Sequence, residues 1–375
     1  MARILVNARF GVKKTGIGKV IEGYLCELEK IDDVNEYYIF VNKDHIEAFK
    51  FSNKNFKILS NSISSKNVFL NHLWTWTAMF WHARQKKIDL IFLPSIVFFW
   101  RSKFKSILIQ HDLIEYYINS QQWYKLLFRK ITFPITFKSV TKIVCVSNNT
   151  LEDMQKIFQI QRSKLVYIPN GLAREKKYLT KSNMTNFYAK HDIKSQFMLY
   201  VGTLTEPQKN LVRVIQAFNI VASNDSSIDL VLVGNKGKGF ANIEKEIDSS
   251  LFKSRIKVLG YLSDDVVCRL YKDALFFVFP SQYEGFGLPI LEAMSHGCPV
   301  LTSDSSSLYE VAVDAAVLVD CKSVDSIAKG MTSLLTSEKR REYLREKGTE
   351  RSKDYSWKSS SLKLLELIDT TINKS

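Results

Sequence analysis

Short apolar runs alternate with amphipathic stretches along the whole chain. In the first half, such runs predict buried strands at residues 3–7, 37–42, 89–94, 106–111 and 142–147. A second series begins near residue 197 and continues at 229–234, 256–260, 275–280, 298–303 and 315–320. Helical periodicity fills several intervals, including 18–30, 150–158, 211–222 and 289–296. Strands that alternate with helices are typical of parallel sheets covered on both faces.

The two series predict an α/β protein with two Rossmann-like, doubly wound parallel-sheet domains. A chain of 375 residues suits two domains, because domains commonly have about 100–200 residues. We expect an N-terminal domain, a polar and basic linker, a C-terminal domain and a terminal helix, over residues 1–172, 173–195, 196–355 and 356–375.

Composition narrows the partners and the compartment. The chain has 53 Lys+Arg and 38 Asp+Glu, a net charge of +15, which favours nucleic acid, an anionic membrane or phosphorylated substrates as partners. Nucleic acid is disfavoured because no recognised binding motif is present. The five cysteines include no CxxC pair, which argues against disulfides or zinc. With no signal-peptide pattern and no apolar run approaching the ~20 residues of a membrane span, we expect a cytoplasmic protein, peripheral on the inner membrane face at most.

Two acids flank a glycine-rich bend after the predicted strand 275–280. Glu284 and Glu292 lie on either side of Gly-Phe-Gly-Leu-Pro. The bend should emerge at the carboxyl edge of the sheet, where ligands bind in such folds. Pro289 suits the first position of a short helix, which would place Glu292 in its first turn. The helix N-terminus would attract a diphosphate or sugar hydroxyls. Alternatively, Glu292 only complements the helix dipole and Glu284 is solvated.

Five segments, taken in order, resemble retaining GT-B glycosyltransferases of family 4. The family's E-x7-E signature resembles EGFGLPILEAMSHGCPV, and the other matching segments are TGIGKVIEGYL (15–25), ILIQHDL (107–113), IVCVSNNTLEDM with LVYIPNGL (165–172), and YVGTLTEPQKNL (200–211). The resemblance covers most of the chain and extends to bacterial polysaccharide and O-antigen mannosyltransferases. It implies a GT-B fold, in which two domains face each other across a cleft and the C-terminal helix returns to the N-terminal domain.

The resemblance assigns the catalytic side chains. Glu284 would contact the donor sugar's hydroxyls near the transferred carbon, and Glu292 would bind the ribose hydroxyls. Lys209 would neutralise the diphosphate as its charge grows during bond cleavage, a type of stabilisation that often dominates catalysis. His111 would lie beside the transferred sugar on the acceptor side, in a binding role. The alternatives are a solvated Lys209 and a structural His111.

Further donor contacts follow from the same resemblance. Backbone N–H groups of Phe286, Gly287 and Leu288 would approach the diphosphate and sugar. Gly16 would let the N-terminal loop close over the donor. Near the base, the resemblance places Leu262 and Asp264.

The sequence departs from the family pattern beside the diphosphate. Many members have arginine where this chain has Thr203, and some relatives with this threonine have arginine where it has Gln208. Thr203 would still lie in the donor site. Arg213 or a lysine of the loop 234–239 could replace the missing cation, and the residues do not decide between them.

The implied reaction transfers a hexose from a nucleoside-diphosphate sugar to a glycan acceptor, lipid-linked in surface-polysaccharide assembly, with retention at the anomeric carbon. Mannose from GDP-mannose is the closest match, and UDP-glucose, UDP-GlcNAc, UDP-galactose and dTDP-rhamnose remain open as donors. No carboxylate is evidently placed as a nucleophile. The resemblance implies an internal-return path, in which the leaving phosphate helps to deprotonate the acceptor. The run 263–265 is read as a helix start, and we expect neither a metal nor any cofactor besides the nucleotide-sugar co-substrate.

Three other functions are weighed against transfer: a sugar-nucleotide epimerase, a phosphorylase, and a catalytically silent binding subunit. The segment 200–211 argues against the first two, and Thr203 leaves room for the third.

The segment 121–142 mixes aromatic and basic side chains. It suits either an anionic membrane surface or a helix whose aromatic face is buried in the core.

Overall fold

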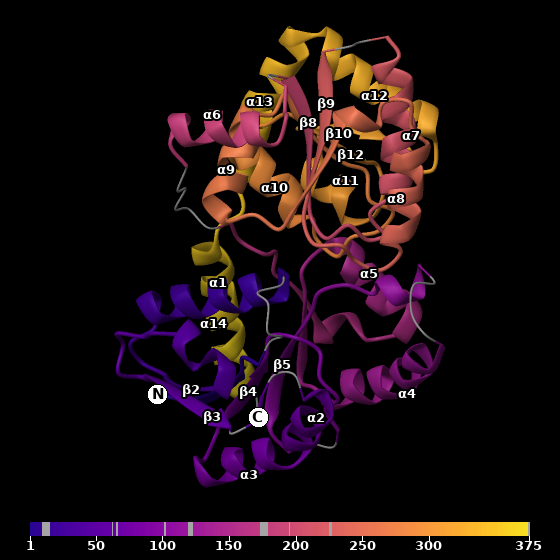
Figure 1. Ribbon diagram of the computed structural model, residues 1–375. Coiled ribbons are helices and arrows are strands. Elements are labelled where there is room, and N and C mark those ends of the chain that lie inside the picture. Colours follow the sequence, from indigo (N-terminus) through magenta and orange to yellow (C-terminus); the bar gives the residue numbers. More distant parts are fainter. Residues whose placement is uncertain are drawn as a thin grey trace. The chain divides into compact units, whose positions relative to one another are not determined.

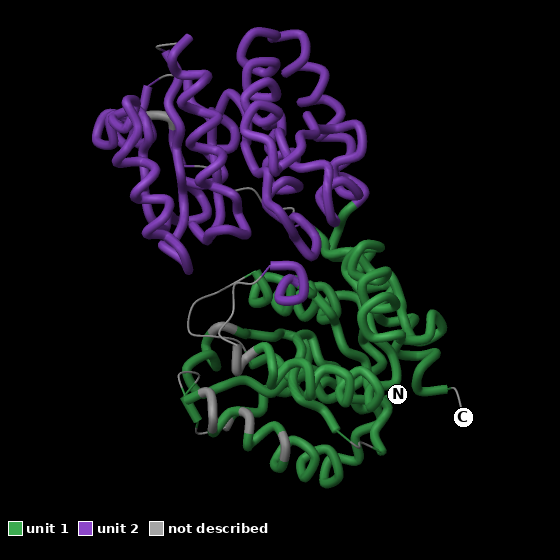
Figure 2. The backbone as a smooth tube through the Cα atoms, turned by 90° about the vertical axis from the view of Figure 1, so that its right-hand side faces the viewer, with its two compact units in different colours: residues 1–113, 121–171, 355–375 green, residues 114–120, 172–354 purple. Residues whose placement is uncertain are grey.

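The protein forms two compact units in a computed structural model (Figures 1 and 2). The structure describes residues 1–9, 16–61, 63–64, 67–100, 103–118, 123–172, 179–194, 196–224 and 227–373. Unit 1 comprises residues 1–113, 121–171 and 355–375, and unit 2 comprises residues 114–120 and 172–354.

Unit 1 contains a seven-stranded parallel sheet with the strand order β3-β2-β1-β4-β5-β6-β7. Its strands are β1 (Arg3–Asn7), β2 (Glu36–Asn42), β3 (Phe56–Asn61), β4 (Leu90–Leu93), β5 (Lys105–Gln110), β6 (Lys142–Cys145) and β7 (Leu165–Tyr167). The five strands predicted from apolar runs are all present. The two additional strands, β3 and β7, lie at the sheet edges, where fewer side chains are buried and the apolar run is weaker.

Helices cover both faces of this sheet. They are α1 (Gly16–Ile31), α2 (Val68–Trp76), α3 (Ala78–Gln85), α4 (Trp123–Ser139), α5 (Asn148–Phe158) and α14 (Trp357–Asn373). Helix α14 packs against α1 and β5. The rings of Tyr24 and Trp357 meet edge to face at 5.2 Å, and Ser360 Oγ donates a hydrogen bond to Pro169 O at 2.7 Å. The predicted return of the C-terminal helix to the N-terminal domain is therefore confirmed.

Unit 2 contains a six-stranded parallel sheet with the order β10-β9-β8-β11-β12-β13. Its strands are β8 (Gln196–Val201), β9 (Ile228–Val233), β10 (Ile256–Gly260), β11 (Phe276–Phe279), β12 (Val300–Ser303) and β13 (Val317–Val319). Each coincides with a predicted apolar run. Every residue of β9 and β11 is buried, as expected for central or near-central strands that are covered on both faces.

The helices of unit 2 form two layers around its sheet. They are α6 (Lys181–Lys190), α7 (Leu211–Ala222), α8 (Phe240–Ser249), α9 (Asp264–Asp273), α10 (Leu288–Ser295), α11 (Ser306–Ala312), α12 (Val324–Thr336) and α13 (Glu338–Ser352). Helices α7, α8 and α12 lie on one side, and α9, α10 and α13 lie on the other (Figure 1). Helix α6 lies inside the stretch expected to be a linker, and it is held by the buried Met184 and by a 2.8 Å hydrogen bond from Tyr188 to Asp273.

Each sheet has a point where the strand order reverses. In unit 1 this point lies between β1 and β4, and in unit 2 it lies between β8 and β11. Successive crossovers leave such a point in opposite directions, so a crevice opens beyond the carboxyl ends of its two strands. Ligands of doubly wound folds bind in that crevice. The loops that follow β1, β4, β8 and β11 are therefore the places to look for a site.

Candidate active site

Two loops meet at the reversal point of unit 2 and are tied together by hydrogen bonds. They are the loop after β8, residues 202–210, and the loop after β11, residues 280–287. Gln282 donates from its backbone N–H to Gln208 O at 2.9 Å and from its side chain to Pro207 O at 2.8 Å. The fully buried Asn210 donates to Pro280 O at 3.1 Å. The side chains carried by the two loops therefore have fixed places.

Lys209 and Glu284 form an ion pair where these loops meet. Lys209 Nζ lies 2.5 Å from Glu284 Oε1, and the two side chains are only 14% and 12% exposed. The same ammonium lies 5.0 Å from the centroid of the buried Phe279 ring, where the face of the aromatic ring favours a cation. Removing either partner would leave a poorly solvated charge. The structure thus brings together the lysine and the acid that the sequence places 75 residues apart.

The backbone of Glu284 is held from both sides by serines at the start of α11. Its N–H donates to Ser306 Oγ at 3.1 Å, and Ser307 Oγ donates to its carbonyl oxygen at 2.8 Å. Ser306 has a φ of +53°, a conformation that costs a non-glycine residue on the order of 1–2 kcal/mol. Its hydroxyl thereby stays aimed at the loop, and the carboxylate of Glu284 projects from a fixed main chain.

Helix α10 begins directly after the glycine-rich bend. It spans Leu288–Ser295, with Pro289 in its first turn and Gly287 as its N-cap. Gly287 has a φ of +111°, and a Cβ there would lie 2.8 Å from Leu308 Cδ2, so the bend requires glycine. The backbone N–H groups of the first turn carry partial positive charge. This end of α10 is suited to an anion such as a diphosphate.

Glu292 lies beyond the first turn of α10, which contains no acid. The predicted first-turn position was wrong, because the helix starts at Leu288 rather than at Pro289. Glu292 Oε2 accepts a hydrogen bond of 3.5 Å from the buried Tyr271 hydroxyl. Burial, and then the charge of Glu292, raises the pKa of Tyr271, so the tyrosine remains a donor. A position outside the first turn removes the basis for a role limited to the helix dipole.

Thr203 is exposed and lies beside the lysine-rich loop 234–239. Leu204 N donates to Asn235 O, and Glu206 N donates to Lys238 O, both at 2.9 Å. Lys236 is paired with Glu244 at 3.2 Å. Arg213 Nη1 donates to Asn210 Oδ1 at 2.9 Å. The loop 234–239 thus lies next to Thr203, the position where many family members have arginine. Which cation replaces that arginine stays a prediction.

Leu262 and Asp264 follow the carboxyl end of β10. Leu262 is half-buried, and the exposed Asp264 is the first residue of α9. The reading of 263–265 as a helix start is confirmed. The assignment of both residues to a nucleotide base stays a prediction.

The other two predicted site residues are in unit 1. His111 directly follows β5, is half-buried, and its Nε2 lies 2.7 Å from Pro94 O, the residue after β4. A carbonyl can only accept, so Nε2 carries the proton. Burial lowers the pKa of His111, which keeps the ring neutral at pH 7. Gly16 begins α1 and is exposed. His111 thus lies at the carboxyl end of β5. Its acceptor-side role and the donor-side role of Gly16 stay predictions.

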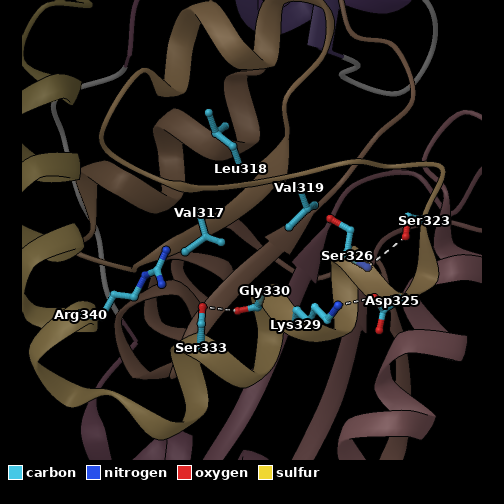
Figure 3. Close-up of a pocket in the computed structure, with 10 residues that line it drawn as sticks. All are labelled: Val317, Leu318, Val319, Ser323, Asp325, Ser326, Lys329, Gly330, Ser333 and Arg340. Atoms are coloured by element: carbon cyan, nitrogen blue, oxygen red, sulfur yellow. Dashed lines mark hydrogen bonds and ion pairs between the residues drawn. The ribbon is translucent and has the colours of Figure 1, made fainter.

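A separate hollow of about 410 Å³ lies between β13 and α12 (Figure 3). It contains none of the predicted site residues. Its polar groups bond mainly among themselves: Lys329 pairs with Asp325 at 2.7 Å, and Ser333 Oγ donates to Gly330 O at 2.7 Å. These are ordinary contacts within α12. The hollow is therefore a weaker candidate for the active site than the loops of Lys209 and Glu284.

In the part of the chain that the structure describes, no three His, Cys, Asp or Glu side chains are grouped so that they could hold a metal ion. None of the described helices is both long enough and apolar enough to cross a lipid bilayer.

Sequence reasoning missed the residues that support the site. Asn210, Ser306 and Ser307 hold the loop backbones, and Tyr271 contacts Glu292. Each bonds to a partner between 21 and 111 residues away, a distance that periodicity cannot reveal. Only Asn210 had a local signal, since it follows Lys209 directly at the start of a predicted helix.

Comparison with curated proteins finds relatives among O-antigen mannosyltransferases. The chain is 32% identical over 225 residues to O-antigen chain mannosyltransferase B of Escherichia coli, covering 59% of this chain and 58% of that protein. It is 24% identical to O-antigen chain mannosyltransferase RfbU of Salmonella typhimurium, covering 88% of this chain and 91% of that protein. The chain thus spans less than two thirds of the first relative and nearly all of the second.

Solved structures confirm the predicted GT-B fold. Sucrose-phosphate synthase from Thermosynechococcus elongatus superposes with a TM-score of 0.81 at 17% identity, covering 100% of both chains. Anabaena HepE in complex with UDP-glucose superposes with a TM-score of 0.73 at 14% identity, covering 99% of this chain and all of that chain. At these identities the likeness concerns the fold.

Two family models divide the chain between them. The model of Glycosyltransferase Family 4 matches residues 38–176, and the model of Glycosyl transferases group 1 matches residues 184–351. These matches agree with the GT-B fold and with the E-x7-E loop of unit 2. The chain therefore belongs to glycosyltransferase family 4.

Proposed function

We propose that this protein is a retaining hexosyltransferase that transfers mannose from GDP-mannose to a glycan acceptor, lipid-linked in bacterial surface-polysaccharide assembly. The observation that carries the proposal is the Lys209–Glu284 pair of 2.5 Å beside the N-terminus of α10. A cation, an anion-binding helix end and a carboxylate that can accept from sugar hydroxyls are the three groups that an activated sugar requires. They lie together at the reversal point of the sheet, where this fold class binds nucleotides.

The ion pair defines how the donor would enter. The diphosphate binds against the first turn of α10 and draws Lys209 toward its oxygens. Glu284 then exchanges its ammonium partner for hydroxyls of the sugar. Because Lys209 begins beside the site and is held by a fixed loop, little reorganisation accompanies the growth of charge on the leaving diphosphate.

The chemical step proceeds on one face of the sugar. The bond from the anomeric carbon to the diphosphate oxygen breaks, and the acceptor oxygen bonds to the same face. The proton of the acceptor hydroxyl passes to the departing phosphate oxygen. His111 binds on the acceptor side. A covalent glycosyl adduct trapped on Glu284 would contradict this path, since it would show a carboxylate nucleophile.

The donor assignment rests on the relatives. The two O-antigen mannosyltransferases support mannose as the transferred sugar, whereas the UDP-glucose complex of HepE supports a UDP-sugar as the second candidate. An epimerase would convert the donor alone to its epimer, and a phosphorylase would cleave a glycosidic bond only when inorganic phosphate is supplied. Incubations with donor alone and with added phosphate therefore separate these alternatives from transfer.

The test is a transfer assay that combines the protein with a bacterial cytoplasmic-membrane fraction as the source of acceptor. The radiolabelled donor is GDP-mannose, UDP-glucose, UDP-GlcNAc, UDP-galactose or dTDP-rhamnose. We expect labelled glycan from GDP-mannose, with undiminished rate in EDTA because lysine and the helix end replace a divalent ion. Transfer only from another donor would refute mannose. Loss of activity in chelator that manganese restores would refute metal independence.

The exposed face of α4 supports a membrane partner. Phe133 and Phe137 point into the core, while Leu127, Phe128, Ile131 and Ile135 are 51%, 50%, 59% and 40% exposed. On a helix these four occupy one face, opposite the buried one. Lys130 and Lys138 are exposed on the same helix. An apolar face with adjoining cations suits the headgroup layer of an anionic bilayer, and the enzyme would meet lipid-linked acceptors there on the cytoplasmic side.

Replacing Ile131 with glutamate is expected to weaken binding to phosphatidylglycerol-containing vesicles at least about tenfold, because it removes a fully inserted aliphatic side chain and adds an anion. Co-sedimentation with vesicles measures the effect. Ile220→Glu is the matched control, since Ile220 is an isoleucine of unit 2 that is 48% exposed. Equal binding by both variants and the unchanged protein would show that α4 does not contact the membrane.

A further inference from the structure

Arg9 is a cation enclosed by neutral groups. Its Nε donates to Asn7 Oδ1 at 3.0 Å, and its Nη1 donates to the backbone oxygen and Oδ1 of Asn71 at 2.8 and 3.2 Å. Its Nη2 donates to Thr75 Oγ1. The guanidinium also lies 4.7 Å from the centroid of the Trp74 ring. Four of its five N–H groups are thereby occupied, and one N–H of Nη2 is left over.

Among the described residues, no carboxylate forms an ion pair with Arg9. Burial is the cause that lowers the pKa of Arg9 to about 10. Withdrawing a charge from water without a counter-charge is unfavourable, and proteins normally pair such a group. In unit 2, by comparison, the half-buried Lys209 is paired with Glu284.

The position of Arg9 in the fold indicates where an anionic ligand would bind. Arg9 follows the last residue of β1 by two positions, so it lies at the carboxyl edge of the sheet, where the strand order reverses between β1 and β4. His111 hydrogen-bonds to Pro94 at the end of β4, on the same edge. This is the crevice in which doubly wound domains bind ligands.

A purely structural role would explain less. The contacts of Arg9 do tie the end of β1 to α2. A neutral amide, which has two N–H groups, could make part of these bonds to Asn7, Asn71 and Thr75 without withdrawing a charge from water. Arginine adds the property that amides lack, which is a charge matched to phosphate oxygens.

We propose that Arg9 forms a phosphate-binding subsite in unit 1, which takes a phosphate group carried by the acceptor. The existence of the subsite depends only on the geometry of unit 1. That its phosphate belongs to an acceptor rests on the proposed function. Two sources share this chemistry: the diphosphate that links a glycan to a lipid carrier, and a phosphate ester on a sugar.

The binding test uses inorganic phosphate and does not depend on catalysis. Thermal unfolding is followed in phosphate and in sodium chloride of equal ionic strength. We expect phosphate to raise the melting temperature of the unchanged protein, because a ligand stabilises the state that binds it. Arg9→Gln should lose that increment, and Arg9→Lys should keep part of it. Arg3→Gln is the control, because Arg3 begins the same strand and lies 41% exposed beside Glu36. An equal increment in Arg9→Gln and the unchanged protein would overturn the proposal.

A second measurement covers the case in which Arg9→Gln does not fold. Phenylglyoxal modifies accessible arginines, and peptide mass analysis of the unchanged protein gives the rate at Arg9 and at Arg3. Phosphate should slow modification of Arg9 and leave Arg3 unaffected. Identical rates at Arg9 in phosphate and in chloride would overturn the proposal.

Acceptor kinetics separate the two sources. Arg9→Gln should raise KM by about 10- to 100-fold for a phosphate-bearing acceptor, the loss expected for one charge-assisted hydrogen bond, with kcat and donor KM unchanged. An effect with the diphosphate-lipid acceptor alone assigns the subsite to the carrier, and an effect with a sugar phosphate alone assigns it to the glycan. No effect with either overturns the proposal. Binding of GDP that is lost in Lys209→Ala tests the donor site separately, so the two failures can be told apart.

Discussion

Replacing Lys209 with alanine is expected to lower kcat/KM for sugar transfer by about 100- to 1,000-fold, the range seen when one preorganised electrostatic group is removed. The ammonium is held at 2.5 Å from Glu284 beside the helix end that would bind the diphosphate. Alanine leaves the leaving group's charge without its cation and also leaves Glu284 unpaired. Initial rates with saturating acceptor measure the change.

A control and a double replacement sharpen this prediction. Lys236→Ala removes a lysine of the neighbouring loop that is 64% exposed, and it should change kcat/KM less than about tenfold if Lys209 is the principal cation. Because Lys209 and Glu284 contact each other, the double alanine variant should lose less than the product of the two single losses. A double variant whose loss of kcat/KM equals the product of the two single losses would contradict a coupled pair at the reacting diphosphate. Equal losses for Lys209→Ala and Lys236→Ala would contradict it too.

Replacing Gly234 with alanine is expected to lower the free energy of unfolding of unit 2 by about 3 kcal/mol, at the upper end of overpacking effects. A Cβ at Gly234 would lie 1.9 Å from Gly202 O, and backbone cannot move aside as a flexible side chain would. The loops 202–210 and 234–239 would separate, which also withdraws the support of Lys209. Hydrogen exchange at the amides of β8 and β9, read by mass spectrometry, reports on this unit.

Gly260→Ala measures the cost of a positive φ without crowding, whereas Gly234, with a φ of +143°, combines a positive φ with the close contact. Gly260 has a φ of +69°, but a Cβ there would meet nothing within 4 Å. Its replacement should cost only the left-handed conformation, on the order of 1 kcal/mol. If the two alanine variants exchange at the same rates, close packing of the loop on Gly202 is not what stabilises this part of unit 2.

The sequence predicted the central strands because they are buried on both faces and therefore read as unbroken apolar runs. It predicted α7 from its helical periodicity, and α10 from periodicity together with Pro289 at its start. It did not predict β3, whose Lys57 and Ser60 face solvent, or α6, whose buried Met184 stands in a polar context. In both cases the information lies in packing against distant segments rather than in local periodicity.

The candidate site could be predicted as far as its residue types. Glu284, Glu292 and Lys209 were identified from their motifs, and the reversal between β8 and β11 places the loops of Lys209 and Glu284 side by side. The direct pairing of Lys209 with Glu284 could not be predicted, because it depends on loops joined by Gln282 and Asn210. Arg9 was missed for a related reason: its isolation from every described carboxylate is a property of the folded unit alone.

The most direct test of the donor site is a crystal structure of the protein with GDP-mannose. We expect the diphosphate to contact Lys209 Nζ and the first-turn amides of α10, with Glu284 turned from the lysine to the hydroxyls of the sugar. A nucleotide bound elsewhere, with the Lys209–Glu284 pair still closed, would contradict the account.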